Sequence, residues 1–335
     1  MKRRKFITLF GVAAVAWPLA TRAQQPGNPY RIAIINPFAA VETLNEAASP
    51  GRYRFFFEEL RRLGFQEGSN LVVERYSGIG KIEHLDELLQ TVAASKPDVI
   101  LVLAMEDVLK ATPVTIPIVE VGLDPIAFGL TSNLAHPDRN ITGVTMIAGG
   151  ELYAKHLELL RQASPTASKV ACLTSRDLWE EPSNILGPLR EEAKTLGIAL
   201  IPSTLEPPYS DAEYRRVFAA MVEERADGLI VTQAIWNYAH QPLIADLAAS
   251  ARLPAIYPTR SFVDQGGLMS YGAVPAEAWR RAATAVVEIL RGAKPSDVPY
   301  YRPSNFELVV NLKTAKALDL TMSQLIMARA NDVIE

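Results

Sequence analysis

The sequence predicts an α/β protein built from two doubly wound, three-layer lobes that are joined by a multi-stranded hinge. Three observations predict this fold. The chain has 335 residues, which is more than one hydrophobic core usually organises. Short apolar runs alternate with amphipathic stretches, as in parallel sheets that helices cover. The order of these segments recurs after about 130 residues, which is the size of one domain.

The first copy of the repeat lies between residues 31 and 121. Its strands are continuous apolar runs, as expected when helices cover both faces of a sheet. Its first helix carries Phe56 and Leu60 on one face and ends at Gly64, a residue type that commonly terminates helices. We expect strands at 31–36, 70–76, 98–103 and 116–121, and helices from about 50 to 63 and from 82 to 94.

The second copy repeats this order between residues 169 and 257. The matching segments are Leu63-Gly64-Phe65 with Leu196-Gly197-Ile198, Pro97-Asp98 with Ala226-Asp227, and Ile116-Pro117 with Leu253-Pro254. We expect strands at 169–174, 198–203, 228–233 and 255–257, and helices at 182–196 and 212–224. Doubly wound sheets bind their ligands at the carboxyl ends of the strands, so two facing lobes would form a single cleft.

The remaining C-terminal segment is too short to form a third domain. It contains an amphipathic helix at 275–291 and an apolar run at 306–312. We expect it to return across the hinge, which suits a protein that opens and closes. The predicted first lobe comprises residues 28–145 plus 275–298, and the second comprises 146–274 plus 299–335.

The first 23 residues have the pattern of a signal peptide. Lys2, Arg3, Arg4 and Lys5 precede an apolar run at 6–20 that is too short to span a bilayer comfortably. Small residues at the cleavage positions predict that the signal is removed after Ala23. The paired arginines resemble a twin-arginine signal, with ordinary secretion as the alternative. Both export routes lead out of the cytoplasm.

Composition excludes several other classes of protein. The formal net charge is −3, and no basic run outside the N-terminus could neutralise a row of phosphates, so nucleic acid is not an expected partner. No later segment is long and apolar enough to predict a membrane span. The single cysteine, Cys172, lies in an apolar run and is expected to pack in the core.

Four segments carry a resemblance to a known family: IPIVEVGLDP at 116–125, NITGV at 140–144, GGLMSYG at 266–272 and FELVVNLKTAKAL at 306–318. Together they resemble the periplasmic substrate-binding components of ABC transporters, in the group whose ligands include aromatic amino acids. The resemblance implies the fold of the type I periplasmic binding proteins. It also implies a periplasmic location, a small organic ligand such as an amino acid or aromatic compound, and permease subunits of the inner membrane as partners.

Loops at strand ends supply the candidate ligand-binding residues. Aromatic side chains among them could sandwich a flat ligand, or could simply cover the core of a lobe. Acidic residues could bind an ammonium group, and Arg260 could bind a carboxylate. Asp124 could equally cap a helix that begins at Pro125. The candidates are Asn36, Phe38, Met105, Glu106, Asp124, Trp179, Trp236, Tyr257, Arg260 and Tyr271.

The sequence contains no recognisable catalytic motif. None of its four histidines has the spacing of a metal site, and the glycine-flanked Ser270 does not fit the Gly-x-Ser-x-Gly nucleophile motif. We therefore expect no enzyme activity, cofactor or metal ion. A ligand sensor that contacts a membrane receptor is the alternative function, and an enzyme is a less favoured one.

Overall fold

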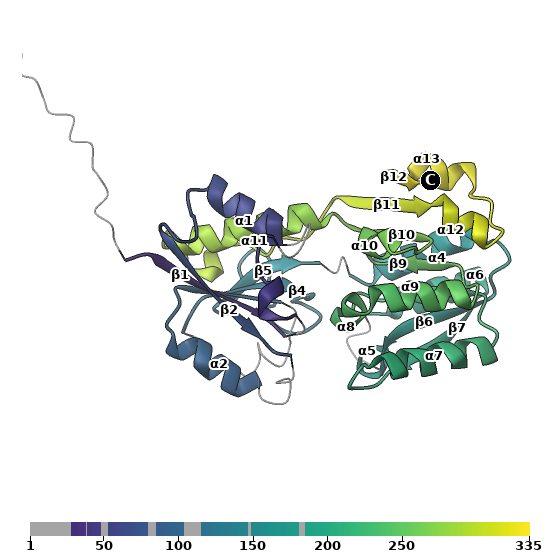
Figure 1. The fold of residues 1–335 in the computed structure, drawn as a ribbon, viewed down its shortest axis with the longest axis horizontal. Coiled ribbons are helices and arrows are strands. Elements are labelled where there is room, and N and C mark those ends of the chain that lie inside the picture. The colour runs from purple at the N-terminus through teal and green to yellow at the C-terminus, as the bar shows by residue number, and fades with distance from the viewer. Residues whose placement is uncertain are drawn as a thin grey trace, which may run out of the picture.

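The computed structural model describes residues 28–37, 39–47, 53–79, 85–103, 115–146, 149–180 and 185–335. In these ranges the chain forms two α/β lobes that lie side by side (Figure 1). Each lobe contains one sheet with helices on both of its faces. The two-lobed architecture predicted from the sequence is thus confirmed. The predicted signal peptide lies outside the described residues.

The first lobe contains a five-stranded parallel sheet in the order β2-β1-β3-β4-β5. Its strands are β1 (Tyr30–Asn36), β2 (Leu71–Ser77), β3 (Val99–Leu103), β4 (Ile118–Gly122) and β5 (Ile141–Thr145). Its helical segments are η1 (Val41–Thr43), α1 (Tyr53–Arg62), α2 (Leu85–Ala94), α11 (Pro275–Leu290) and η3 (Pro295–Asp297).

The second lobe contains a seven-stranded sheet in the order β12-β11-β10-β9-β8-β6-β7, in which only β10 and β11 pair antiparallel. Its strands are β6 (Lys169–Ser175), β7 (Ala199–Leu205), β8 (Gly228–Val231), β9 (Ala255–Tyr257), β10 (Met269–Ala273), β11 (Phe306–Asn311) and β12 (Asp332–Ile334). Its helices are α4 (Glu151–Ala163), α5 (Arg176–Glu180), α6 (Gly187–Leu196), α7 (Asp211–Glu223), α8 (Ile235–Ala239), α9 (Gln241–Ser250), α10 (Arg260–Asp264), α12 (Leu312–Ala317) and α13 (Gln324–Arg329).

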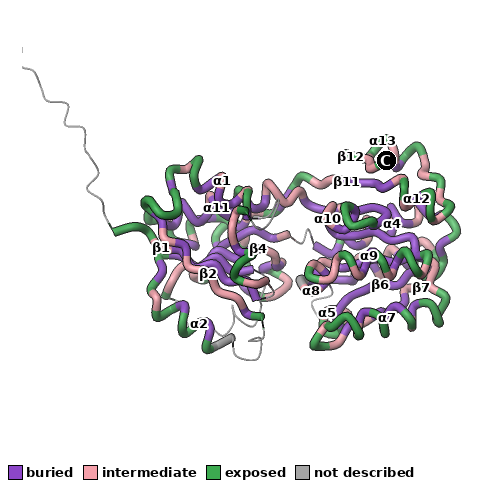
Figure 2. The backbone as a smooth tube through the Cα atoms, viewed as in Figure 1, coloured by how far each residue is buried: buried purple, intermediate pink, exposed green. Residues whose placement is uncertain are grey.

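The alternation of side chains along each strand divides both lobes into two core layers. In β1, Ile32 and Ile34 pack toward α1 and α11, whereas Ala33 and Ile35 pack toward α2. In the second lobe, one face of the sheet packs on α4 and α6 and the other on α7 and α9. Figure 2 shows the result, with buried strands inside and exposed turns of helix outside. Cys172 is buried in the layer beneath α4 and α6, as the sequence predicts.

Strand β5 and helix α4 have no counterpart among the elements predicted from sequence. The apolar run of β5 is interrupted by Gly143, which weakens the strand pattern. The structure requires this glycine, because a Cβ atom there would lie 2.0 Å from the backbone oxygen of Glu120 on β4. A close approach of two backbones, and not strand propensity, therefore selects the residue.

The chain crosses between the lobes after β5, after β10 and again after Tyr301. Tyr301 belongs to the segment 299–335, which was predicted to be part of the second lobe, but it contacts the first sheet. Its N–H donates to the Gly143 carbonyl (2.8 Å), and its own carbonyl accepts from the Thr145 N–H (3.0 Å). The first and third crossings therefore leave the first lobe side by side.

Glu277, in the first turn of α11, joins the second crossing to the third. One of its carboxylate oxygens accepts a hydrogen bond from the Tyr301 hydroxyl, and the other accepts one from the Asn305 side chain (2.8 Å). These two hydrogen bonds lower the pKa of Glu277 below its usual range. The guanidinium of Arg281 lies over the Tyr301 ring, 4.9 Å from its centroid. We call Glu277, Tyr301 and Asn305 the hinge clamp.

We predict that Glu277→Ala lowers the free energy of unfolding by about 1–2 kcal/mol, because it removes two hydrogen bonds to a carboxylate that is only partly buried. Urea unfolding followed by circular dichroism measures the change. Glu288→Ala, at an exposed position of the same helix, is the control and should change stability by less than about 0.5 kcal/mol. If both variants changed the free energy of unfolding by the same amount, the stabilising role of the hinge clamp would be contradicted.

His156 on α4 is fully buried between the aromatic rings of Tyr153 and Tyr271. Its Nε2 lies 2.6 Å from the backbone oxygen of Tyr271. A carbonyl oxygen can only accept, so Nε2 carries the proton, and Nδ1 has no hydrogen-bond partner among the described residues. Burial lowers the pKa of His156 to about 4. The imidazole is therefore neutral in the folded protein at neutral pH.

We predict that His156 makes the protein less stable as the pH falls from about 6.5 to about 4. In this range the unfolded chain binds a proton at His156 and the folded chain does not. The free energy of unfolding therefore falls by up to about 1.4 kcal/mol for each pH unit. Unfolding in urea at several pH values should show this slope reduced in His156→Gln. The matched change at the exposed His136 should leave the slope unaltered.

Candidate functional site

The carboxyl ends of the strands in the two sheets meet where the chain crosses between the lobes. Directly after β5, the Met146 carbonyl accepts a hydrogen bond from the side chain of Gln233, which follows β8 (3.1 Å). Parallel strands of one sheet all end at the same edge of that sheet. The carboxyl ends of the other strands therefore lie along the edge that holds Met146 in the first sheet and the edge that holds Gln233 in the second. We call these residues the inter-lobe region: 36–37, 122–124 and 145–146 in the first lobe, and 174–179, 232–236, 258–260 and 271–273 in the second.

In the first lobe, the predicted candidates Asn36 and Asp124 both lie in the inter-lobe region. Asn36 ends β1, is buried, and donates a hydrogen bond to the Tyr53 hydroxyl (3.2 Å). Asp124 Oδ1 accepts from the backbone N–H groups of Ile126 and Ala127, at 3.1 Å each. This oxygen caps a turn at 125–129, and not the helix that the sequence offered as an alternative to ligand binding. The candidates Phe38, Met105 and Glu106 lie outside the described residues.

Glu120 on β4 carries a buried carboxyl group near the Asp124 turn, and it was not among the residues predicted from the sequence. Its Oε1 accepts from the Leu123 N–H (2.7 Å), while Oε2 has no partner among the described residues. Burial raises the pKa of Glu120 well above its ordinary value, and the nearby Asp124 carboxylate raises it further. The sequence feature that could have identified Glu120 is an acidic residue inside an otherwise apolar strand.

Trp236 on α8 forms a stacked pair with Tyr209, with ring centroids 4.3 Å apart and ring planes 5° apart. The indole Nε1 is buried and has no hydrogen-bond partner within the described part of the chain. Both rings are only partly buried. This pair is therefore an aromatic surface with one unused donor at the carboxyl end of β8.

Two further aromatic candidates contact other side chains of the second lobe. The Arg190 guanidinium lies over the Trp179 ring, 4.6 Å from its centroid, and donates to the Trp179 carbonyl (2.5 Å). Tyr271 stacks on Phe306 at 5.6 Å. Both candidates are partly buried, so each combines a packing role with some exposed surface.

Tyr257 ends β9 and Arg260 follows three residues later, and the structure engages both in contacts within the second lobe. Tyr257 is 1% exposed and stacks on Phe262 in the core, so it does not reach the inter-lobe surface. Arg260 forms ion pairs with Asp332 (2.5 Å) and Asp264 (3.3 Å). Two carboxylates already balance its charge, which removes the reason for assigning it to a ligand carboxylate.

Unpartnered buried polar atoms mark the second-lobe side of the inter-lobe region. They are Thr174 Oγ1 near the end of β6, Gln233 Oε1 after β8, and Trp236 Nε1. A buried polar group without a partner costs about 1–3 kcal/mol, so such groups indicate a missing partner from solution. Thr174 and Gln233 lie in strand-end loops that the sequence predicts to line the cleft, although they are not among the ten named candidates. The sequence feature that marks both residues is a polar side chain at the end of a buried strand.

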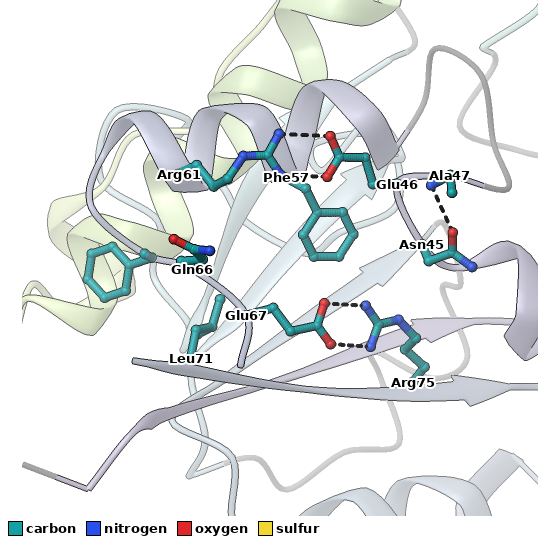
Figure 3. Close-up of a pocket in the computed structure, with 10 residues that line it drawn as sticks. Asn45, Glu46, Ala47, Phe57, Arg61, Gln66, Glu67, Leu71 and Arg75 are labelled. Atoms are coloured by element: carbon teal, nitrogen blue, oxygen red, sulfur yellow. Dashed lines mark hydrogen bonds and ion pairs between the residues drawn. The ribbon is translucent and has the colours of Figure 1, made fainter. Parts of the chain in front are cut away.

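A separate cavity of about 350 Å³ lies at the outer edge of the first lobe, beside β2 (Figure 3). Phe57 and Leu71 line it together with two ion pairs, Arg61–Glu46 and Arg75–Glu67, each of which uses both terminal guanidinium nitrogens and both carboxylate oxygens. All of its lining residues come from the first lobe, so it is distinct from the inter-lobe region. Its two arginines and two glutamates neutralise each other.

Within the ranges that the structure covers, no cluster of three or more His, Cys, Asp or Glu side chains is arranged to hold a metal ion. None of the helices in these ranges combines the length and the apolar character needed to cross a bilayer.

Comparison with known proteins identifies relatives of the whole two-lobed unit. A tyrosine-binding protein from Clostridioides difficile is 22% identical over 269 residues, covering 79% of this chain and 75% of that protein. A conserved domain protein from Vibrio cholerae has a similar structure, with a TM-score of 0.79 and 21% identity over 91% of this chain and all of that one. A Streptococcus pneumoniae ABC domain solved with L-Trp gives a TM-score of 0.76 and 20% identity over 92% of this chain and all of that one.

The family model described as ABC transporter substrate binding protein matches residues 43–334, which include nearly all elements of both lobes. Members of this family bind substrates and are not enzymes, in agreement with the lack of catalytic motifs in the sequence. The chain belongs to the family of ABC transporter substrate-binding proteins.

Proposed function

We propose that this protein is the periplasmic solute-binding component of an ABC importer, and that its ligand is an aromatic amino acid or a related aromatic compound held between the lobes. The observation that carries the choice of ligand is the Trp236–Tyr209 stack with its unused indole N–H. Aromatic faces provide a large contact area at a small cost in side-chain entropy. A flat ligand at the carboxyl end of β8 would cover this surface.

The relatives support the same class of ligand. The tyrosine-binding protein and the structure solved with L-Trp both have an aromatic amino acid in their descriptions. Both resemble this chain across the two lobes, so an equivalent site between the lobes is the simplest extension.

The predicted export signal supports the proposed location. The basic start, the apolar run at 6–20 and the small residues before Gln24 are the pattern of a cleaved signal peptide. From the periplasm, the ligand would pass to permease subunits in the inner membrane. We further propose that the lobes close on the ligand by bending at the three crossings, since hinge motions are absorbed by a few connecting residues.

The proposed function predicts that L-tryptophan or L-tyrosine stabilises the protein against heat. At a ligand concentration of about 100 times Kd, binding to the folded state alone contributes about 2.7 kcal/mol, which should raise Tm by about 5 °C or more. A thermal-shift screen should include L-phenylalanine, L-alanine and D-glucose for comparison. If no aromatic compound raises Tm at millimolar concentration, the proposed ligand class is wrong.

We also predict that Trp236→Ala weakens binding of the best aromatic ligand by about 30-fold, because it removes the stacking surface. Trp236→Phe keeps an aromatic face and loses only the N–H donor, so it should weaken binding by about fivefold. Isothermal titration calorimetry measures both affinities. Unchanged affinity in both Trp236→Ala and Trp179→Ala would refute the aromatic contact.

A further inference from the structure

Gln233 has an anchored side chain at the point where the two lobes meet. It lies directly after Thr232 at the end of β8, and its backbone N–H donates to the Tyr153 hydroxyl (3.2 Å). Its side-chain Nε2 donates to the Met146 carbonyl in the first crossing (3.1 Å). Met146 in turn donates its N–H to the Gly122 carbonyl at the end of β4 (3.2 Å). The amide of Gln233 thus connects the second lobe to the strand ends of the first.

This anchor determines which way the amide points. A backbone carbonyl can only accept a hydrogen bond, so the amide atom facing Met146 is the nitrogen. The oxygen Oε1 is thereby held as an acceptor in a fixed direction. It is buried and has no partner among the described residues. Burial makes an unsatisfied acceptor unfavourable, so a donor from solution or from a ligand is expected there.

The surroundings of Gln233 favour a positively charged donor. Its neighbours in the hydrogen-bonded chain are acceptors, namely the backbone carbonyls of Met146 and Gly122. The arginines of the inter-lobe region are occupied elsewhere. Arg176 pairs with Glu206 (2.5 Å) and Glu180 (3.4 Å), and Arg260 is held by two aspartates.

We propose that Gln233 Oε1 accepts a hydrogen bond from the α-ammonium group of the bound amino acid, and that Gln233 thereby makes the site select amino acids over the corresponding deaminated acids. This inference rests on the proposed function and names the group that recognises one end of the ligand. Because the same amide holds Met146, the contact also ties the ligand directly to the first crossing.

The test compares two ligand pairs that differ only in the amino group: L-tryptophan with indole-3-propionate, and L-tyrosine with 3-(4-hydroxyphenyl)propionate. Titration calorimetry on the full two-lobed protein gives the ratio of affinities within each pair. A hydrogen bond to a charged group predicts that the protein prefers the amino acid by about 10- to 100-fold. In Gln233→Met, which keeps the chain length and has no amide acceptor, we expect the ratio to fall to within about threefold.

Two further variants keep the result interpretable. Gln265→Met changes an exposed glutamine of the same lobe and should preserve the preference. Gln233→Asn retains an amide that is one methylene shorter, so it provides the same test should the methionine variant fail to fold.

The outcomes separate the inference from the proposed function. If the unmodified protein binds none of the four compounds, the proposed ligand class is overturned and the inference falls with it. If it binds only the deaminated acids, the inference alone is wrong. If the amino acids bind but the deaminated acids bind equally well, the inference alone is wrong. It is also wrong if Gln233→Met keeps the preference for the amino acid. In both cases the Gln233 oxygen accepts a hydrogen bond from water and not from the ligand.

Discussion

The covering of both sheet faces by helices is the constraint on which the rest of this structure depends. Strands β3 and β4 are buried on both sides, and their side chains are apolar except for Glu120, whose carboxyl group accepts a hydrogen bond from the Leu123 N–H. Polar side chains that meet solvent are therefore displaced to the strand ends. Because parallel strands end together, these groups collect along one edge of each sheet, and the three crossings bring the two edges together.

This constraint also explains why the lobes could be predicted from the sequence. Continuous apolar runs bounded by glycine and proline mark strands covered on both faces, and their recurrence after about 130 residues marks the second lobe. The pattern failed at β5, where Gly143 is required by its contact with Glu120. Backbone contact between neighbouring strands leaves no periodic signal in the sequence.

The candidate site was less predictable, because the availability of a side chain depends on partners that are distant in sequence. The position of Arg260 after a strand predicted that it lies near the inter-lobe region. Its ion pair with Asp332, 72 residues later, could not be predicted from the sequence. Tyr257 likewise follows the pattern of a strand-end aromatic, and only the packing of Phe262 against it shows that it is enclosed. Gln233 lies in a strand-end loop that was predicted to line the cleft, but the sequence could not single it out within that loop, because its contact with Met146 spans 87 residues.

The order of the crossings has a consequence for how the protein is assembled during synthesis. Helix α11 covers one face of the first sheet, yet it is made only after β6 to β10 of the second lobe. A nascent chain that stops near Met146 would leave Ile32, Ile34 and Val119 without their covering helix. The first lobe is thus completed only when most of the second already exists, so the first half of the gene does not encode a self-sufficient folding unit.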